Sequence, residues 1–141
     1  MRWPRSAWFD GSLARGTPMP ILEFTVVLRE GEALGDDLAQ RLADAAAPVF
    51  AAAPGNVWVT LAELPGHCYA ENGCAVADTP RPVFVRITQA GDAAPADRAA
   101  EACALVTALA PLLARDPTQV HLIYAPPGAG RIAFGGRLRT D

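Results

Sequence analysis

The chain has 141 residues, a net charge of −3 and a hydrophobic content of 51%. This length fits one domain that buries its own core, and the slightly acidic balance gives no basic field for nucleic acid. No apolar segment approaches the roughly 18 to 20 residues of a membrane span, and residues 1–18 lack the apolar core of a secretory signal. Three scattered cysteines (Cys68, Cys74, Cys103) are typical of a reducing compartment. We therefore expect a cytoplasmic protein that binds neither nucleic acid nor a membrane.

The first structural unit that the sequence predicts follows an N-terminal extension, residues 1–19. An apolar segment rich in β-branched residues, 21–28, predicts a strand. A helix is expected from about Asp36, with Leu38, Leu42 and Ala45 on one stripe. A second strand is expected over 56–64, and the glycine-containing segment 69–73 predicts a turn or small hairpin.

A second unit repeats this order of elements. Strands are expected over 83–88 and 119–125, on either side of a helix that begins near Pro95, and residues 132–136 predict a closing hairpin. The two units align without a gap when the chain is shifted by 63 residues, and the matched pairs include Thr25 with Thr88, Leu42 with Leu105, Pro48 with Pro111, Pro54 with Pro117 and Gly73 with Gly136. Pro48 and Pro111 are expected to kink or end the helices. We therefore predict one domain over residues 20–141, made of two β-α-β repeats at about 20–78 and 82–138.

A strand–helix–strand crossover makes its two strands parallel. Two crossovers predict an α/β (α+β) fold with a four-stranded mixed sheet and both helices on one face. The first strand is largely apolar on both faces, because Leu22, Phe24 and Val26 alternate with Ile21 and Val27. No further helix is predicted to cover the second face, so we expect an oligomer.

This layout resembles the tautomerase superfamily. PILEFTVVLREG, which begins at Pro20, looks like the start of the short 4-oxalocrotonate tautomerases, and GRIAFGGRL (130–138) is similar to their C-terminal hairpin. The first unit, through YAENG, looks closer to one half of the cis-3-chloroacrylic acid dehalogenases. The resemblance implies a homotrimer of fused β-α-β units that acts on a small carboxylate without a cofactor or metal.

The resemblance also implies site residues. Pro20 takes the place of the catalytic N-terminal proline, and Arg29 that of one of two arginines that grip the substrate carboxylate. The second of these arginines is replaced by Glu32. Glu71 falls on the glutamate that activates water in the dehalogenases, and Tyr69 lies at about the position of the hairpin aromatic.

Further differences limit the resemblance. Trp58 stands where the short tautomerases carry a substrate-binding arginine. The dehalogenases carry their glutamate in the second half, whereas here it lies in the first. Pro82, at the start of the second unit, is internal; its nitrogen is an amide, and we assign it no catalytic role.

The implied reaction requires Pro20 to be the N-terminus, after loss of Met19 and everything before it. A free α-amino group titrates near pH 8, and an apolar pocket beside Arg29 would favour the neutral amine that acts as general base. Two alternatives remain at this stage. One is a hydratase or hydrolytic dehalogenase of 3-substituted acrylates with Glu71 activating water, and the other is a non-catalytic trimeric module whose pocket is blocked by residues 1–19.

Each candidate residue also has a plain structural interpretation. Arg29 and Glu71 fit solvated surface charges, and Tyr69 and Trp58 fit packing residues. We expect Arg86 to pair with Glu23 rather than bind substrate, and we assign no role to Arg131 or Arg137. His67, Cys68 and Cys74 lie close in sequence without a second ligand cluster, so no metal site is expected.

Overall fold

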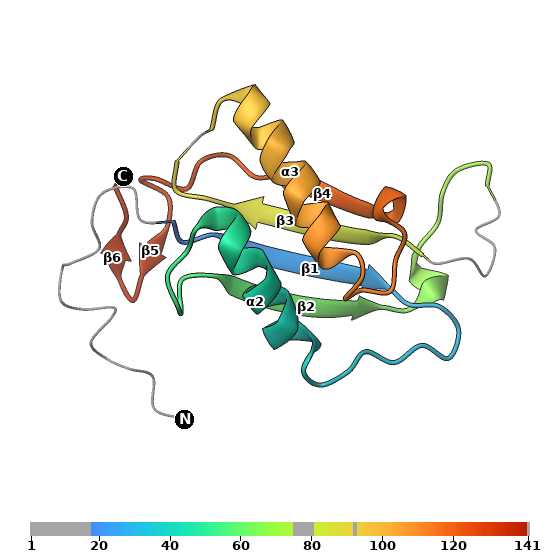
Figure 1. Cartoon of the computed structure of the whole chain (residues 1–141). Helices are drawn as coiled ribbons and strands as arrows, with labels where there is room; N and C mark the ends of the chain where they lie inside the picture. Colours follow the sequence, from blue (N-terminus) through green and yellow to red (C-terminus); the bar gives the residue numbers. More distant parts are fainter. Residues whose placement is uncertain (1–17, 75–80, 92, 141) are drawn as a thin grey trace.

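The computed structural model of the protein describes residues 18–74, 81–91 and 93–140. Residues 1–17, most of the expected extension, lie outside the described residues, so the predicted division into extension and domain stays a prediction. The helices and strands follow the predicted order of two repeated units (Figure 1) and are β1 (Ile21–Val27), α2 (Leu38–Phe50), β2 (Trp58–Leu64), β3 (Val83–Thr88), α3 (Pro95–Leu109), β4 (Val120–Tyr124), β5 (Ala133–Phe134) and β6 (Arg137–Leu138).

The main sheet has four strands in the order β2-β1-β3-β4. Each unit contributes a parallel pair, β1 with β2 and β3 with β4, and the two units meet through the antiparallel pair β1–β3. This arrangement confirms the predicted four-stranded mixed sheet. Strands β5 and β6 form a separate hairpin beside the start of β1 (Figure 1).

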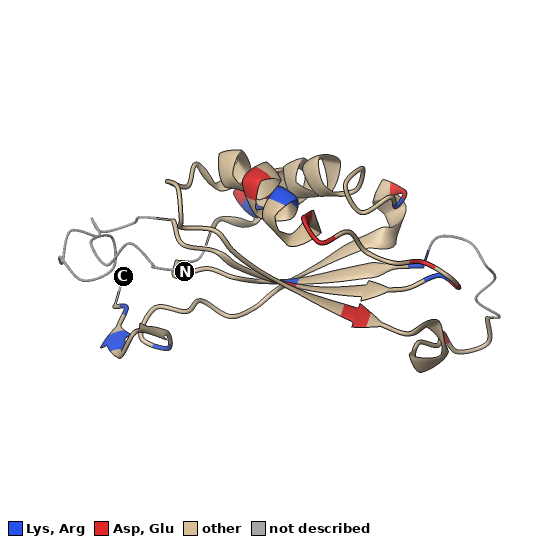
Figure 2. Ribbon diagram, turned by 90° about the horizontal axis from the view of Figure 1, so that it is seen from below, with Lys and Arg blue, Asp and Glu red and all other residues tan. Residues whose placement is uncertain are grey.

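Both helices cover the same face of the sheet (Figure 2). The core lies between them and the sheet, where Leu22, Phe24 and Val26 of β1 are buried. Helix α2 buries Leu38 and Leu42 as predicted, with Ala46 rather than Ala45 completing the stripe, because a helix returns to the same face every three to four residues. Helix α3 buries Leu105 and Leu109.

The positions of prolines account for the helix ends better than capping by acidic side chains does. Pro48 lies inside the last turn of α2, which ends two residues later. Helix α3 has Pro95 in its first turn and ends before Pro111. Asp37 occupies the N-cap position of α2, but its side chain makes no capping hydrogen bond.

The two units are related by an approximate twofold axis in the middle of the sheet. Glu23 of β1 lies directly opposite Arg86 of β3, and these two residues are repeat equivalents, 63 positions apart. Their side chains form the predicted ion pair, with 3.9 Å between Arg86 Nε and Glu23 Oε2. Both side chains are more than half exposed, so the pair contributes little to stability.

The second face of the sheet carries no helix among the described residues (Figure 2). Ile21, Thr25 and Phe84 on this face are only partly buried, and Ile123 is 48% exposed. A half-exposed apolar sheet face of this kind is a typical contact surface. Within the described segments, no helix has the length and apolar character needed to cross a membrane.

Candidate active site

The predicted site residues divide between the two ends of the sheet. Parallel strands begin at the same end, so Pro20 and Trp58 lie together. Arg29 follows β1, whose seven residues span roughly 23 Å at about 3.3 Å per residue. Tyr69 and Glu71 follow β2 and belong to the same far end as Arg29. We call these the Pro20 end and the Pro82 end, and one chain does not unite Pro20 with Arg29 in one pocket.

At the Pro20 end, Pro20 itself is buried immediately before β1. Its carbonyl accepts a hydrogen bond of 3.1 Å from the backbone N–H of Trp58, and Met19 before it is 5% exposed. While Met19 is attached, the nitrogen of Pro20 is an amide without a basic lone pair. The position is therefore desolvated, and whether the Pro20 nitrogen is an amide or an amine depends on where the mature chain begins.

Trp58 packs against an aromatic residue that the sequence did not predict for the site, Phe134 of β5. The ring centroids are 5.2 Å apart and nearly perpendicular, and the indole N–H of Trp58 donates to the carbonyl of Gly55. Phe134 is the repeat equivalent of Glu71, 63 residues further on, which is the signal that could have revealed it. The aromatic pair holds the β5–β6 hairpin against the Pro20 end.

A groove of about 910 Å³ adjoins this aromatic pair along the outer edge of β2. Trp58 and Phe134 contribute to its wall, together with Ala39, Ala43 and Ala47 on one side of α2. The lining is predominantly small and apolar, with Gln40, Asp44 and Thr60 as its polar side chains. Such a lining suits a small, largely apolar ligand.

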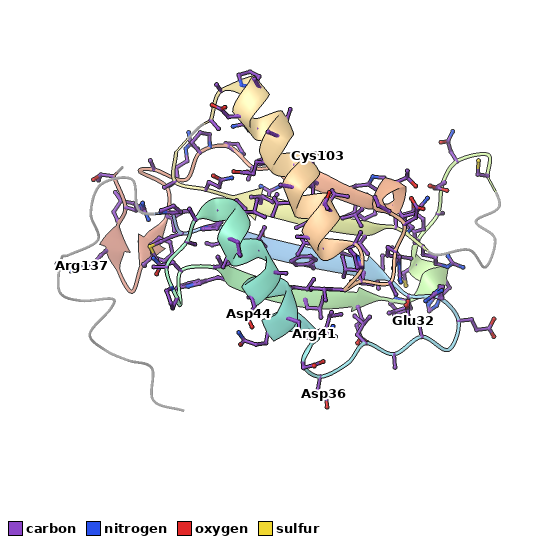
Figure 3. The ribbon with its side chains drawn as sticks, in the orientation of Figure 1. Glu32, Asp36, Arg41, Asp44, Cys103 and Arg137 are labelled. Atoms are coloured by element: carbon purple, nitrogen blue, oxygen red, sulfur yellow. The ribbon has the colours of Figure 1, made fainter. Side chains whose placement is uncertain are left out.

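At the Pro82 end, the loop after β1 is fixed by a buried ion pair that involves Glu32, which Figure 3 labels. Arg115, whose side chain is fully buried, donates to both oxygens of Glu32 at 2.7 and 2.8 Å. It also donates to the carbonyls of Val27, Arg81 and Leu113. The hydrogen bonds from Arg115, assisted by those from Arg29, lower the pKa of Glu32 to about 2. Glu32 is thus a structural anion.

Arg29 takes part in the same network. Its backbone N–H and its guanidinium both donate to Glu32, at 3.1 and 3.2 Å, and its side chain remains 38% exposed. Glu32 shares its charge with Arg115, so the network as a whole carries one net positive charge. Arg29 is therefore oriented and still accessible to an anion.

Tyr69 and Glu71 form a hydrogen-bonded pair at the same end. The hydroxyl of Tyr69 donates to a carboxylate oxygen of Glu71 at 2.9 Å, and the ring lies 6.2 Å from that of Phe84. Partial burial and this hydrogen bond raise the pKa of Tyr69. His121 contacts the Phe84 ring at 5.5 Å. Glu71 thus has a fixed orientation although it is exposed.

No group of three or more metal-ligating side chains occurs in residues 18–74, 81–91 and 93–140. Cys68, Cys74 and Cys103 are exposed thiols. The oriented Glu71 carboxylate and the Arg29 guanidinium could take part in acid–base chemistry and in the binding of anions.

No protein-family model matches the sequence, and no curated protein sequence matches it. Solved structures do. The symmetric trimer of the wild-type Q0 fused 4-OT aligns with a TM-score of 0.67 and 16% identity, over 85% of this chain and 95% of that one. The crystal structure of Pt0534 inactivated by 2-oxo-3-pentynoate gives 0.63 and 21%, with the same coverages. Leishmania major MIF2 gives 0.58 and 15%, over 85% and 97%.

These alignments span nearly the whole of each relative and most of this chain. The chain therefore has the fold of the tautomerase superfamily, which confirms the fold that the sequence resemblance implied. At these identities the likeness establishes the backbone arrangement alone.

Proposed function

We propose that this protein is a tautomerase or isomerase of small unsaturated or 2-oxo carboxylates, with Pro20 as its N-terminal general base. The observation that carries the proposal is the position of Pro20, buried directly before β1 and beside the Trp58–Phe134 pair. A neutral secondary amine there accepts a proton from one atom of the substrate and returns it to another, so no cofactor is consumed.

The substrate class is supported by one of the structural relatives. Pt0534 is inactivated by 2-oxo-3-pentynoate, which is itself a small unsaturated 2-oxo carboxylate. The apolar groove and the aromatic pair are compatible with a ligand of this size and kind. We place the enzyme in the cytoplasm, where exposed thiols such as Cys68 and Cys103 remain reduced.

The test is the intact mass of the native protein, measured together with turnover of phenylenolpyruvate. A mass that begins at Pro20, in a protein that ketonises the enol, is the expected result. A native mass that includes Met1 would reject Pro20 as the base.

We further propose that the protein is a homotrimer whose subunits pack their open sheet faces together. The structural relatives include fused 4-OT trimers, and the face that carries Ile123 needs a cover. Light scattering at micromolar concentration is expected to give three times the monomer mass. A stable monomer would contradict the proposal.

In such a trimer, Arg29 reaches a Pro20 site only from a neighbouring subunit. If it anchors the substrate carboxylate, Arg29→Ala should raise KM strongly with a smaller change in kcat, and Arg29→Lys should rescue only in part, because lysine lacks the bidentate fork. Steady-state kinetics of both variants check this. Unchanged kinetics in Arg29→Ala would leave Arg29 as a partner of Glu32 only.

A second candidate function is favoured by the hydrogen bond between Tyr69 and Glu71. An oriented carboxylate can activate water for addition to a 3-substituted acrylate, as in a hydratase or hydrolytic dehalogenase. Glu71 and Pro20 lie at opposite ends of one chain, so this reaction also requires a site built by two subunits. Chloride release from 3-chloroacrylate, abolished by Glu71→Gln, would support it over the leading proposal.

A further inference from the structure

The β5–β6 hairpin has a defined geometry. Gly135 and Gly136, its two turn residues, have positive φ angles of 57° and 86°, which residues with a side chain rarely adopt. The strands on either side pair Phe134 directly with Arg137. Residues directly opposite in an antiparallel pair point to the same face, with Cβ atoms about 5 Å apart. Arg137 therefore shares a face of the hairpin with Phe134.

That face is turned toward the Pro20 end. Phe134 contacts Trp58, and the backbone N–H of Trp58 donates to the carbonyl of Pro20. The hairpin is also tied to the end of β3 by the backbone bonds from Gly128 to Gln89 and from Ala129 to Ala90. Arg137, on the outer strand (Figure 3), is thus an exposed guanidinium one aromatic pair away from the proposed base.

The hairpin also concentrates positive charge at this end (Figure 2). Residues 130–140 contain three arginines and no acidic residue. Arg139 is buried, whereas Arg131 and Arg137 are exposed. Arg98 of α3 lies over the ring of Tyr124 at 5.1 Å. The hairpin therefore adds exposed positive charge at the Pro20 end.

We propose that Arg137 binds the carboxylate of the substrate at the Pro20 end, while the Trp58–Phe134 pair contacts its planar unsaturated part. This inference rests on the proposed function of that end. A guanidinium holds a carboxylate through two parallel hydrogen bonds and gives the ligand a fixed orientation. Arg137 then supplies a cationic contact to the substrate from the same chain as Pro20.

The test measures binding rather than turnover. Isothermal titration of the full chain with cinnamate, a planar unsaturated carboxylate, is expected to show binding that cinnamyl alcohol does not match. Arg137→Gln should raise the Kd for cinnamate by about 10-fold or more, the usual effect of losing a charged hydrogen bond. Arg137→Lys should fall between this variant and the original protein.

Two matched controls remove one exposed arginine each. Arg131→Gln changes the same hairpin, and Arg41→Gln changes the exposed side of α2 (Figure 3). Both should leave the Kd within about twofold, as expected for surface charges without direct contact. An unchanged Kd in Arg137→Gln, an equal loss in Arg131→Gln, or no preference of the original protein for cinnamate over its alcohol would each overturn the assignment.

The binding result and the proposed function can fail separately. Arg137-dependent binding of cinnamate, with no turnover by protein that begins at Pro20, would reject the tautomerase and keep this assignment. Turnover of phenylenolpyruvate whose KM is unaffected by Arg137→Gln would keep the tautomerase and reject Arg137 as its anchor.

Discussion

Protein that begins at Pro20 is expected to ketonise phenylenolpyruvate about 10² to 10⁴ times faster than the chain that begins at Met1, the usual contribution of a general base. In the long form the nitrogen of Pro20 is acylated by Met19 and has no lone pair to offer. In the short form it is a secondary amine whose lone pair can accept a proton. Initial rates of the two purified forms under identical conditions measure the effect.

A third form distinguishes the effect of a free amine from the effect of the proline ring. Pro20→Ala in the short form keeps a free but primary amine, and its rate is expected to fall between the other two. Equal rates in the long and short forms would reject the proline mechanism and turn attention to Glu71. A complete lack of turnover in all three forms would favour a non-catalytic trimeric module.

Replacing Arg115 by methionine is expected to lower the free energy of unfolding by about 3 to 5 kcal/mol, which is a large part of a domain's total stability. The buried guanidinium compensates Glu32 and satisfies the carbonyls of Val27, Arg81 and Leu113. Arg115→Met leaves Glu32, whose side chain is 12% exposed, with the more exposed Arg29 as its remaining cationic partner. Urea unfolding at pH 7 and one fixed protein concentration measures the loss.

The chain offers a matched control for this variant. Arg86→Met also removes an arginine from an ion pair with a glutamate, but that pair is exposed, and its loss should cost less than about 1 kcal/mol. The double variant Glu32→Leu with Arg115→Met should recover part of the loss, since it removes both buried charges. Equal effects of Arg86→Met and Arg115→Met would show that burial of the pair is unimportant.

The same pair makes stability depend on pH in a defined direction. The folded state lowers the pKa of Glu32 from 4.5 to about 2, so ionised Glu32 stabilises the fold fully above pH 4.5. This contribution, of about 3 kcal/mol, is lost as the pH falls from 4.5 to below about 2. Between pH 7 and pH 2.5, stability should therefore fall more in the original protein than in Glu32→Gln.

The fold could be predicted from the sequence because its signals are local and occur twice. Segments rich in apolar and β-branched residues predicted the strands, and the spacing of Leu38 and Leu42 predicted the buried stripe of α2. Asp37 at the N-cap of α2 makes no side-chain capping hydrogen bond, because a residue type that favours a cap does not fix the backbone angles that the cap needs.

The site was less predictable for a different reason. The resemblance placed Pro20 and Arg29 in one pocket, yet a strand of seven residues separates them. The partner of Glu32, Arg115, lies 83 residues away along the chain, and no local pattern links the two. Phe134 could have been found only as the repeat equivalent of Glu71, because nothing else in its local sequence points to the site.

The twofold relation between the units frees this chain from a constraint that identical subunits obey. In a dimer of single units, every substitution occurs twice and alters both symmetric positions at once. Here the equivalent positions have diverged: Trp58 corresponds to His121, and Phe134 to Glu71. The residues at one end of the sheet can thus change while the other end keeps the buried ion pair between Glu32 and Arg115.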